Sequence, residues 1–191
     1  MFKKFWMLSI LVISCYATAD LESFFDIASK ETEVEKKLLK ALAKTETNFS
    51  KYSIGIIAKN PDALNIFFKN NQIKFKQRTT HFSLFINDKD TAIDVYHKFK
   101  YFIHHNPTAI KTYDLGLMQI NEANMKEENE KMFYLDTKLN AIYAGFILQD
   151  CFNYFNKNVK FAIECYNKGT NSKKFGNFEY FQKVRANYLQ L

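Results

Sequence analysis

Apolar residues spaced four or seven positions apart predict a helix that ends near Phe49. Glu46 lies four residues after Leu42 and three before Phe49, so its side chain falls on the apolar face of this helix. A carboxyl group packed against apolar neighbours keeps its proton to a higher pH, as a general acid at neutral pH must. The alternative is a glutamate at a helix end whose side chain reaches water. The other residues of the apolar face are Val34 and Leu38.

Residues 50–112 carry a different pattern. Segments 52–58 and 81–86 are rich in Ile, Phe and Tyr, which is typical of strands, and segment 73–76 alternates as a short strand would. A helix is predicted over residues 91–103. We therefore expect a small α/β unit inside an otherwise helical chain.

Helical patterns return after this unit. Residues 119–131 are compatible with a helix, and a long helix is predicted to begin after Asp136. Further helices are predicted over 159–167 and 178–189. Together with a short helix over 21–29, these patterns predict one α+β domain that is mainly α.

The first residues have the pattern of an export signal. Basic residues open the chain, residues 5–15 form an apolar run too short to span a bilayer, and residues 17–19 suit a signal-peptidase site. We therefore expect a signal peptide over 1–19, a mature domain over 20–191 without a transmembrane helix, and a periplasmic location. The alternative is a lipoprotein signal with Cys15 as the anchor.

Composition narrows the class of partner. At 191 residues, with 47% hydrophobic and 17% aromatic content, the chain has the material for one folded core, and disorder is not expected. Cleavage after residue 19 removes two lysines from a formal charge of +7 and leaves +5. That charge favours an anionic polymer such as a cell wall, whereas no run of basic residues indicates a nucleic acid.

Two cysteines, Cys151 and Cys165, remain in the predicted mature chain. Export would permit a disulfide between them, and they lie on consecutive predicted helices, but two buried and unpaired cysteines fit equally well. His104 and His105 are adjacent, yet no second Cys/His pair accompanies them. We therefore expect neither a metal nor another cofactor.

Three separate segments match the motifs of one enzyme family. The first begins at Glu46, the second at Gly116 and the third surrounds Tyr166. On these motifs the chain resembles the soluble-type lytic transglycosylases, whose catalytic domain is related to goose-type lysozyme. A fourth stretch, from Asp136 to Leu148, also fits the family. The three matched sequences are Glu46-Thr47-Asn48-Phe49, Gly116-Leu117-Met118-Gln119-Ile120 and Cys165-Tyr166-Asn167-Lys168-Gly169.

The resemblance implies a lysozyme-like helical domain. Relatives usually carry Asn-Pro-x-Ala shortly after the catalytic segment, whereas here Asn106-Pro107-Thr108-Ala109 occurs only just before Tyr113. We therefore interpret residues 50–112 as an α/β insertion between the catalytic helix and the Gly-Leu-Met-Gln segment.

The resemblance also implies a reaction. Glu46 would give a proton to the glycosidic oxygen of a peptidoglycan strand, between N-acetylmuramic acid and N-acetylglucosamine. The same carboxylate would then take the proton of the C6 hydroxyl of the muramic acid as this hydroxyl attacks C1. The product would be a 1,6-anhydromuramic acid end.

Supporting roles around Glu46 follow from the same resemblance. Tyr166 is expected to donate a hydrogen bond to Glu46, and Gln119 is expected to contact sugar amide or hydroxyl groups in the cleft. Gly116 would allow the glycan to approach closely because it has no side chain. The other support residues are Thr47, which replaces the usual Ser and can make a similar hydrogen bond, Leu117, Met118 as a sugar-facing or core wall, and Asn167, which would pin the third segment.

Two other functions are compatible with these residues. A hydrolase would need a carboxylate or a positioned water opposite Glu46, and Asp114 and Glu122 are the candidates. A non-catalytic assembly factor would bind glycan and recruit a machine through residues 50–112. The modest size of the chain resembles that of specialised enzymes that open the wall for a secretion or pilus apparatus, which would then be a partner.

Overall fold

The computed structural model describes residues 20–191, and leaves out the side chain of Ser172. The predicted signal peptide, its cleavage site and Cys15 lie outside the described residues. Within the described part of the chain, no helix combines the length and apolar character that a membrane span requires.

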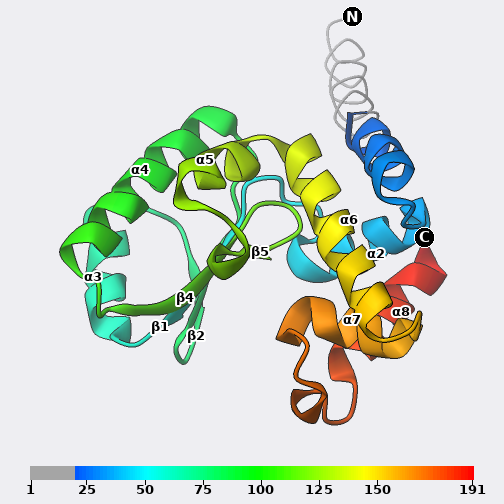
Figure 1. The fold of residues 1–191 in the computed structure, drawn as a ribbon. Helices are drawn as coiled ribbons and strands as arrows, with labels where there is room; N and C mark the ends of the chain where they lie inside the picture. The colour runs from blue at the N-terminus through cyan, green and yellow to red at the C-terminus, as the bar shows by residue number, and fades with distance from the viewer. Residues whose placement is uncertain (1–19) are drawn as a thin grey trace, which may run out of the picture.

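Two lobes lie side by side, each with its own apolar core (Figure 1). The α/β lobe holds the sheet with α3, α4 and α5, and the helical lobe holds the remaining long helices. The prediction of a mainly helical α+β fold is confirmed. The elements of the α/β lobe are β1 (Ile54–Ala58), α3 (Pro61–Asn70), β2 (Lys76–Arg78), β3 (His81–Leu84), α4 (Lys89–His105), β4 (Ile110–Leu115), β5 (Ile120–Asn121), η1 (Glu122–Asn124) and α5 (Glu127–Leu135). Those of the helical lobe are a helix over 20–32, α2 (Lys36–Thr47), α6 (Thr137–Tyr154), α7 (Val159–Lys168), η2 (Ser172–Lys174) and α8 (Glu179–Gln190).

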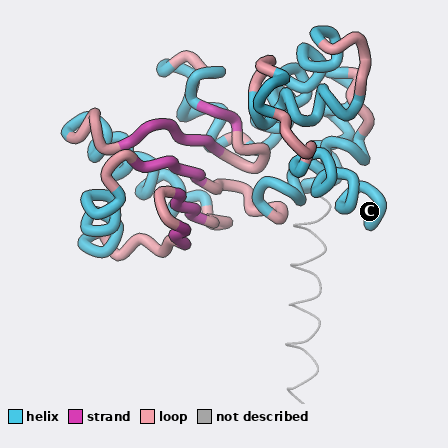
Figure 2. Tube along the Cα trace, turned by 90° about the horizontal axis from the view of Figure 1, so that it is seen from below, coloured by secondary structure: helices cyan, strands magenta, loops and turns pink. Residues whose placement is uncertain are grey.

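The sheet has the strand order β2-β3-β1-β4-β5, and every neighbouring pair is antiparallel. Figure 2 shows its strands confined to one half of the molecule. The central strand β1 alternates buried and half-buried residues, as its Ile-rich sequence predicts. Its partner β4 places Asp114 opposite Gly55. Because Gly55 has no side chain, no side chain stands across from Asp114 on β1.

The chain passes between the two cores at a few points, and the family motifs lie at two of them. Leu115 belongs to the core of the α/β lobe, whereas Leu117 and Met118 belong to the core of the helical lobe. Similarly, Leu42 packs in the helical lobe and Tyr52 in the other. The end of α2 and the Gly116 segment therefore meet where the lobes join.

Two predicted elements are wrong. The short strand lies at Lys76–Arg78 instead of 73–76, because Lys76 to Arg78 pair with β3 while Ile73 and Phe75 pack on the core from a loop. Residues 119–131 do not form one helix. Strand β5 comes first, and the Asn121 side chain then accepts a hydrogen bond from the Ala123 N–H and starts η1. The interpretation of residues 50–112 as an insertion stays a prediction.

A disulfide joins Cys151 on α6 to Cys165 on α7, with 5.8 Å between the two Cα atoms. The sequence allowed either a disulfide or two unpaired cysteines, and the structure contains the disulfide. Because Cys165 directly precedes Tyr166, the bridge anchors the part of α7 that carries the third family motif to the long helix α6.

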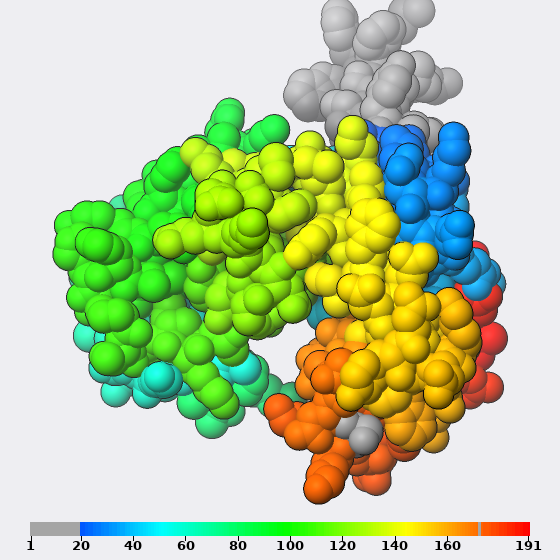
Figure 3. Space-filling model, in the orientation of Figure 1, coloured from blue at the N-terminus to red at the C-terminus, as the bar shows by residue number. Residues whose placement is uncertain are grey.

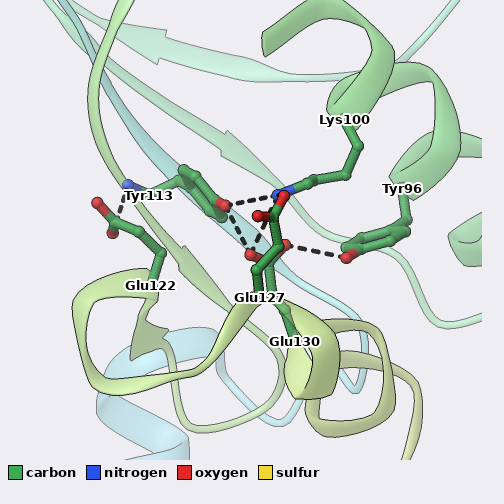
Figure 4. Close-up of polar contacts among 6 residues, drawn as sticks. All are labelled: Tyr96, Lys100, Tyr113, Glu122, Glu127 and Glu130. Atoms are coloured by element: carbon green, nitrogen blue, oxygen red, sulfur yellow. Dashed lines mark hydrogen bonds and ion pairs between the residues drawn. The ribbon is translucent and has the colours of Figure 1, made fainter. Parts of the chain in front are cut away.

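A buried carboxylate ties the elements of the α/β lobe together (Figure 4). Glu130 on α5 is 3% exposed and accepts hydrogen bonds from the hydroxyls of Tyr113, at 2.7 Å, and Tyr96, at 3.0 Å. Lys100 on α4 completes the cluster at 3.2 Å from Glu130 and 3.1 Å from the Tyr113 hydroxyl. The cluster thus fixes β4, next to Asp114, against α4 and α5.

The variant Glu130→Gln is expected to lower the free energy of unfolding by about 2 kcal/mol, because hydrogen bonds to a charged group and the partner of Lys100 are lost together. Urea unfolding followed by circular dichroism measures this loss. Glu127→Gln is the matched control, since Glu127 lies 3.8 Å from the same Lys100 but is 87% exposed, and it should change stability little. Equal losses for both variants would show that the buried cluster contributes nothing particular.

Candidate active site

Glu46 lies in the last turn of α2, at the junction of the lobes. The helix ends there because Asn48 adopts a left-handed backbone conformation, with φ of 50°. Tyr180 on α8 donates a hydrogen bond from its hydroxyl to Glu46 Oε1, and the charge of Asp114 on β4 reaches the same carboxyl group. Glu46 is therefore influenced from both lobes, by a hydrogen bond from the helical lobe and by a negative charge from the α/β lobe.

Burial is the main influence on the acidity of Glu46. It raises the pKa of the carboxyl group to about 7, and the negative charge of Asp114 acts in the same direction. The hydrogen bond from Tyr180 and the charge of Lys183 lower the pKa against this trend. The Glu46 side chain is surrounded by many protein atoms but is only half-buried, so part of it is accessible to solvent. A substantial fraction of Glu46 is therefore protonated at neutral pH and can be reached.

Asp114 is the second carboxyl group of the site. Burial raises its pKa to about 6, a hydrogen bond from Asn121 Nδ2 at 2.8 Å lowers it, and the charge of Glu122 raises it. Glu122 itself is turned to β4, where it accepts hydrogen bonds from the Thr112 hydroxyl at 2.7 Å and from the Tyr113 N–H at 3.1 Å. Of the two carboxylates predicted for a hydrolase, only Asp114 is thus close enough to shift the pKa of Glu46.

The predicted hydrogen bond from Tyr166 to Glu46 is wrong. The Tyr166 hydroxyl donates to the backbone carbonyl of Met118 at 2.7 Å. Burial raises the pKa of Tyr166 well above its usual value, and the charges of Glu46 and Asp114 raise it further, so the ring does lie beside the pair. Tyr166 lines the site and holds the Met118 segment. The hydrogen bond to Glu46 that was predicted for Tyr166 is made by Tyr180.

Sequence reasoning missed Tyr180. It lies 134 positions after Glu46 and outside the three motifs. The available signal was its spacing from Val184, which marks both residues as facing inward on the last helix, and both are buried. That signal predicts burial but does not indicate a partner.

Gly116 has a structural role that was not predicted. Its backbone has φ of 82°, and a Cβ atom there would come within 2.7 Å of Asn140 Cγ. Asn140 is fully buried, and its side-chain oxygen accepts the Met118 N–H at 2.8 Å while its nitrogen donates to the Leu115 carbonyl at 3.1 Å. Gly116 thus makes room for an asparagine that fixes the loop, and the close approach of a glycan stays a prediction. The predicted fourth motif included Asn140 without a role.

The Thr47 hydroxyl makes a hydrogen bond beside Glu46, and whether it matches the bond of the usual Ser stays a prediction. This buried hydroxyl donates to the Leu117 carbonyl at 2.9 Å and joins the end of α2 to the Gly116 segment. Leu117 and Met118 are fully buried in the core of the helical lobe. Met118 is therefore a core wall, and the alternative of a sugar-facing wall is wrong.

Gln119 is half-buried and has a positive φ of 47°. Its amide nitrogen donates to the carbonyls of Gly116, at 2.9 Å, and Ser53, at 3.2 Å, so the side chain bridges the Gly116 segment and the start of β1. Its contact with sugar stays a prediction. Asn167 is exposed at the end of α7, and its role in pinning this segment stays a prediction.

The site offers acid–base groups and hydrogen-bond donors but no cluster suited to a metal. In the described range, 20–191, no three His, Cys, Asp or Glu side chains come together as metal ligands. A cavity of about 540 Å³ lies elsewhere, toward the start of α2, and is lined by Leu38, Ile163 and Val184 among others. Because Glu46 does not line it, this cavity is not the site of the chemistry.

The molecule is hollowed between the lobes. Figure 3 shows a deep gap that separates the α/β lobe from the orange segment containing α7. Asp114 lies on β4 of the α/β lobe, and Tyr166 lies on α7. Fold and site together define a lysozyme-like protein with one acid near neutral pKa at the junction of two lobes.

Comparison with known families agrees with this description. The model of the transglycosylase SLT domain family matches residues 23–188, so the chain belongs to this family. A comparison with curated proteins and one with solved structures each gave no match. The family establishes a function of the lytic transglycosylase type, directed at peptidoglycan.

The raised pKa of Glu46 predicts a pH-dependent effect of Glu46→Gln on stability. The ordinary pKa of 4.5 applies to the unfolded chain and about 7 to the folded one, so folding favours the protonated form. This stabilisation is complete below pH 4.5 and is lost as the pH rises through 7. Because the glutamine side chain cannot ionise, the variant should be more stable than the wild type at pH 8, by up to about 3 kcal/mol, and similar to it at pH 4.

Urea unfolding at pH 4 and pH 8 measures the difference. The exposed Glu128 provides a control, since Glu128→Gln should follow the wild type at both pH values. A Glu46→Gln variant that is less stable than the wild type at pH 8 would contradict a desolvated carboxyl group.

Proposed function

We propose that this protein is a lytic transglycosylase that cleaves the β-1,4 bond between N-acetylmuramic acid and N-acetylglucosamine and forms 1,6-anhydromuramic acid. The observation that carries the proposal is the Glu46 carboxyl group, whose pKa burial raises to about 7 at the junction of the two lobes. A group of this pKa is available both as an acid and, once it has lost its proton, as a base at neutral pH.

In the first step the Glu46 proton moves to the glycosidic oxygen as the bond from C1 to that oxygen breaks. The N-acetyl group of the substrate stabilises the positive charge that develops at C1. In the second step the C6 hydroxyl oxygen of the same sugar bonds to C1, and its proton goes to the Glu46 carboxylate. The acid is thereby regenerated, and no water is consumed.

The described side chains fit this sequence of steps. Tyr180 orients one Glu46 oxygen by donating a hydrogen bond to it. A donor at this point also stabilises the carboxylate between the two proton transfers. Gln119 and Tyr166 belong to segments that Asn140, Thr47 and the disulfide hold rigid, so the walls of the site are preorganised.

Location and partners follow from this function as further proposals. The chain would act as the mature domain 20–191 in the periplasm, on glycan strands of the wall. A signal peptide over 1–19, or an anchor at Cys15, would bring it there. A role for a secretion or pilus apparatus stays a prediction, since no contact within the described residues bears on it.

Product analysis tests the proposal directly. Isolated peptidoglycan digested with the purified protein should release muropeptides that end in 1,6-anhydromuramic acid, which are lighter by one water than hydrolytic products. The variant Glu46→Gln should reduce product formation by at least about a hundredfold, because the proton donor is lost. Mass spectrometry of the digests gives both results. Normal cleavage by Glu46→Gln would refute the role of Glu46 as the proton donor.

A hydrolase is the second candidate, because Asp114 lies close enough to Glu46 to raise its pKa. For a transglycosylase, Asp114→Asn should keep the anhydro product. It should also move the basic limb of the pH profile of kcat/KM to lower pH by up to about one pH unit, because a negative charge beside Glu46 is removed.

For a hydrolase, the same variant should abolish the water-containing product, and this outcome would replace the leading proposal. The exposed Glu127 supplies the control, since Glu127→Gln removes a negative charge from the same lobe without approaching Glu46. Its pH profile should match that of the wild type.

A further inference from the structure

The helix that carries Tyr180 begins without a cap of its own. The residue before α8 is Phe178, which has φ of 56° and makes no side-chain hydrogen bond to the helix. The first N–H groups of a helix need acceptors, which a Ser, Thr, Asp or Asn side chain at this position commonly supplies. A phenylalanine has no acceptor atom. Its ring instead packs on Phe161, with 5.2 Å between centroids, and lies under Lys160.

The missing acceptor comes from the neighbouring helix. Glu164 on α7 is fully buried, and its Oε1 accepts the N–H of Phe181, the third residue of α8, at 2.8 Å. The third N–H of a helix is one that a capping side chain ordinarily bonds. A negative charge near the start of a helix is also favourable to the helix dipole. Glu164 therefore caps α8 from outside the helix.

Lys168 makes this buried carboxylate tolerable. Its ammonium group lies 2.8 Å from Glu164 Oε2, one turn further along α7, and it also donates to the Phe175 carbonyl at 3.2 Å. The first contact compensates the charge of Glu164, since an unpaired buried carboxylate would be costly. The second ties down the loop that leads into α8.

Tyr180 lies in the turn that is capped in this way, directly before Phe181. Its hydroxyl reaches Glu46 from there, and its ring is 8% exposed. We propose that Glu164, paired with Lys168, is a positioning residue that fixes the first turn of α8 and so holds the Tyr180 hydroxyl on Glu46. The inference rests on the proposed role of Glu46 as the acid, but the contact itself can be tested without turnover.

The contact has a measurable signature at Glu46. The Tyr180 hydrogen bond lowers the pKa of Glu46 against the effect of burial. Loss of this bond should therefore raise the pKa of Glu46 above about 7, and the basic limb of the activity profile should move to higher pH with it. Loss of stability alone would not produce this change.

The experiment compares four variants of the purified protein, Tyr180→Phe, Glu164→Ala, Glu164→Gln and the double variant Tyr180→Phe/Glu164→Ala. The pKa of Glu46 is measured by ¹³C NMR titration of its carboxyl group. Tyr180→Phe and Glu164→Ala should each raise this pKa by about one. The double variant should equal either single one, because both remove the same contact. Glu164→Gln keeps an oxygen for the Phe181 N–H and should leave the pKa of Glu46 unchanged even though it lowers the melting temperature.

A Glu46 titration in Glu164→Ala that matches the wild type overturns the inference, and so do additive effects in the double variant. If Glu164→Ala does not fold, Glu164→Asp replaces it, since the shorter side chain keeps the charge but withdraws the oxygen from Phe181. A rise in the pKa of Glu46 is again expected, and no rise counts against the proposal. If the wild type forms no anhydro product, the proposed function fails, whereas the titration still decides the role of Glu164.

Discussion

The structure is organised around the desolvation of one carboxyl group that must still meet a substrate. Helix α2 packs in the core of the helical lobe and ends at the junction with the α/β lobe. Glu46 lies at this end, where burial raises its pKa to about 7. A carboxyl group deeper in the core could not reach a glycan, and one on the surface would have lost its proton at neutral pH. The junction of the lobes satisfies both requirements.

Keeping that junction fixed explains several residues that do no chemistry. Gly116 has no Cβ because Asn140 fills the space, and Asn140 in turn bonds the backbone on both sides of Gly116. Thr47 ties the same loop to the end of α2. The lobes are thus connected through side-chain hydrogen bonds to the backbone. The backbone geometry depends little on which side chains cover the surface. The family motif at 116–120 is in this sense a structural joint beside the acid.

The sequence was sufficient to predict the helix of Glu46, the mainly helical α+β fold and the segments that gather around the acid. It failed for the partners inside the site. The half-buried Tyr166 and the buried Tyr180 both lie near Glu46, and the choice between them depends on the packing of α7 and α8, which no local pattern contains. Helical periodicity likewise gave the wrong structure for residues 119–131, because a strand pair with β4 and a side-chain turn at Asn121 override a weak helical preference there.

Opposing influences on Glu46 suit a group that must act twice. Burial and the charge of Asp114 favour the protonated form, while the Tyr180 hydroxyl and the charge of Lys183 favour the carboxylate. If burial acted alone, the acid would hold its proton too tightly to give it to a glycosidic oxygen. If the donor and the cation dominated, the resulting carboxylate would be too weak a base for a sugar hydroxyl. A pKa of about 7 lies between these cases, which is what proton release and proton recovery by the same carboxyl group require.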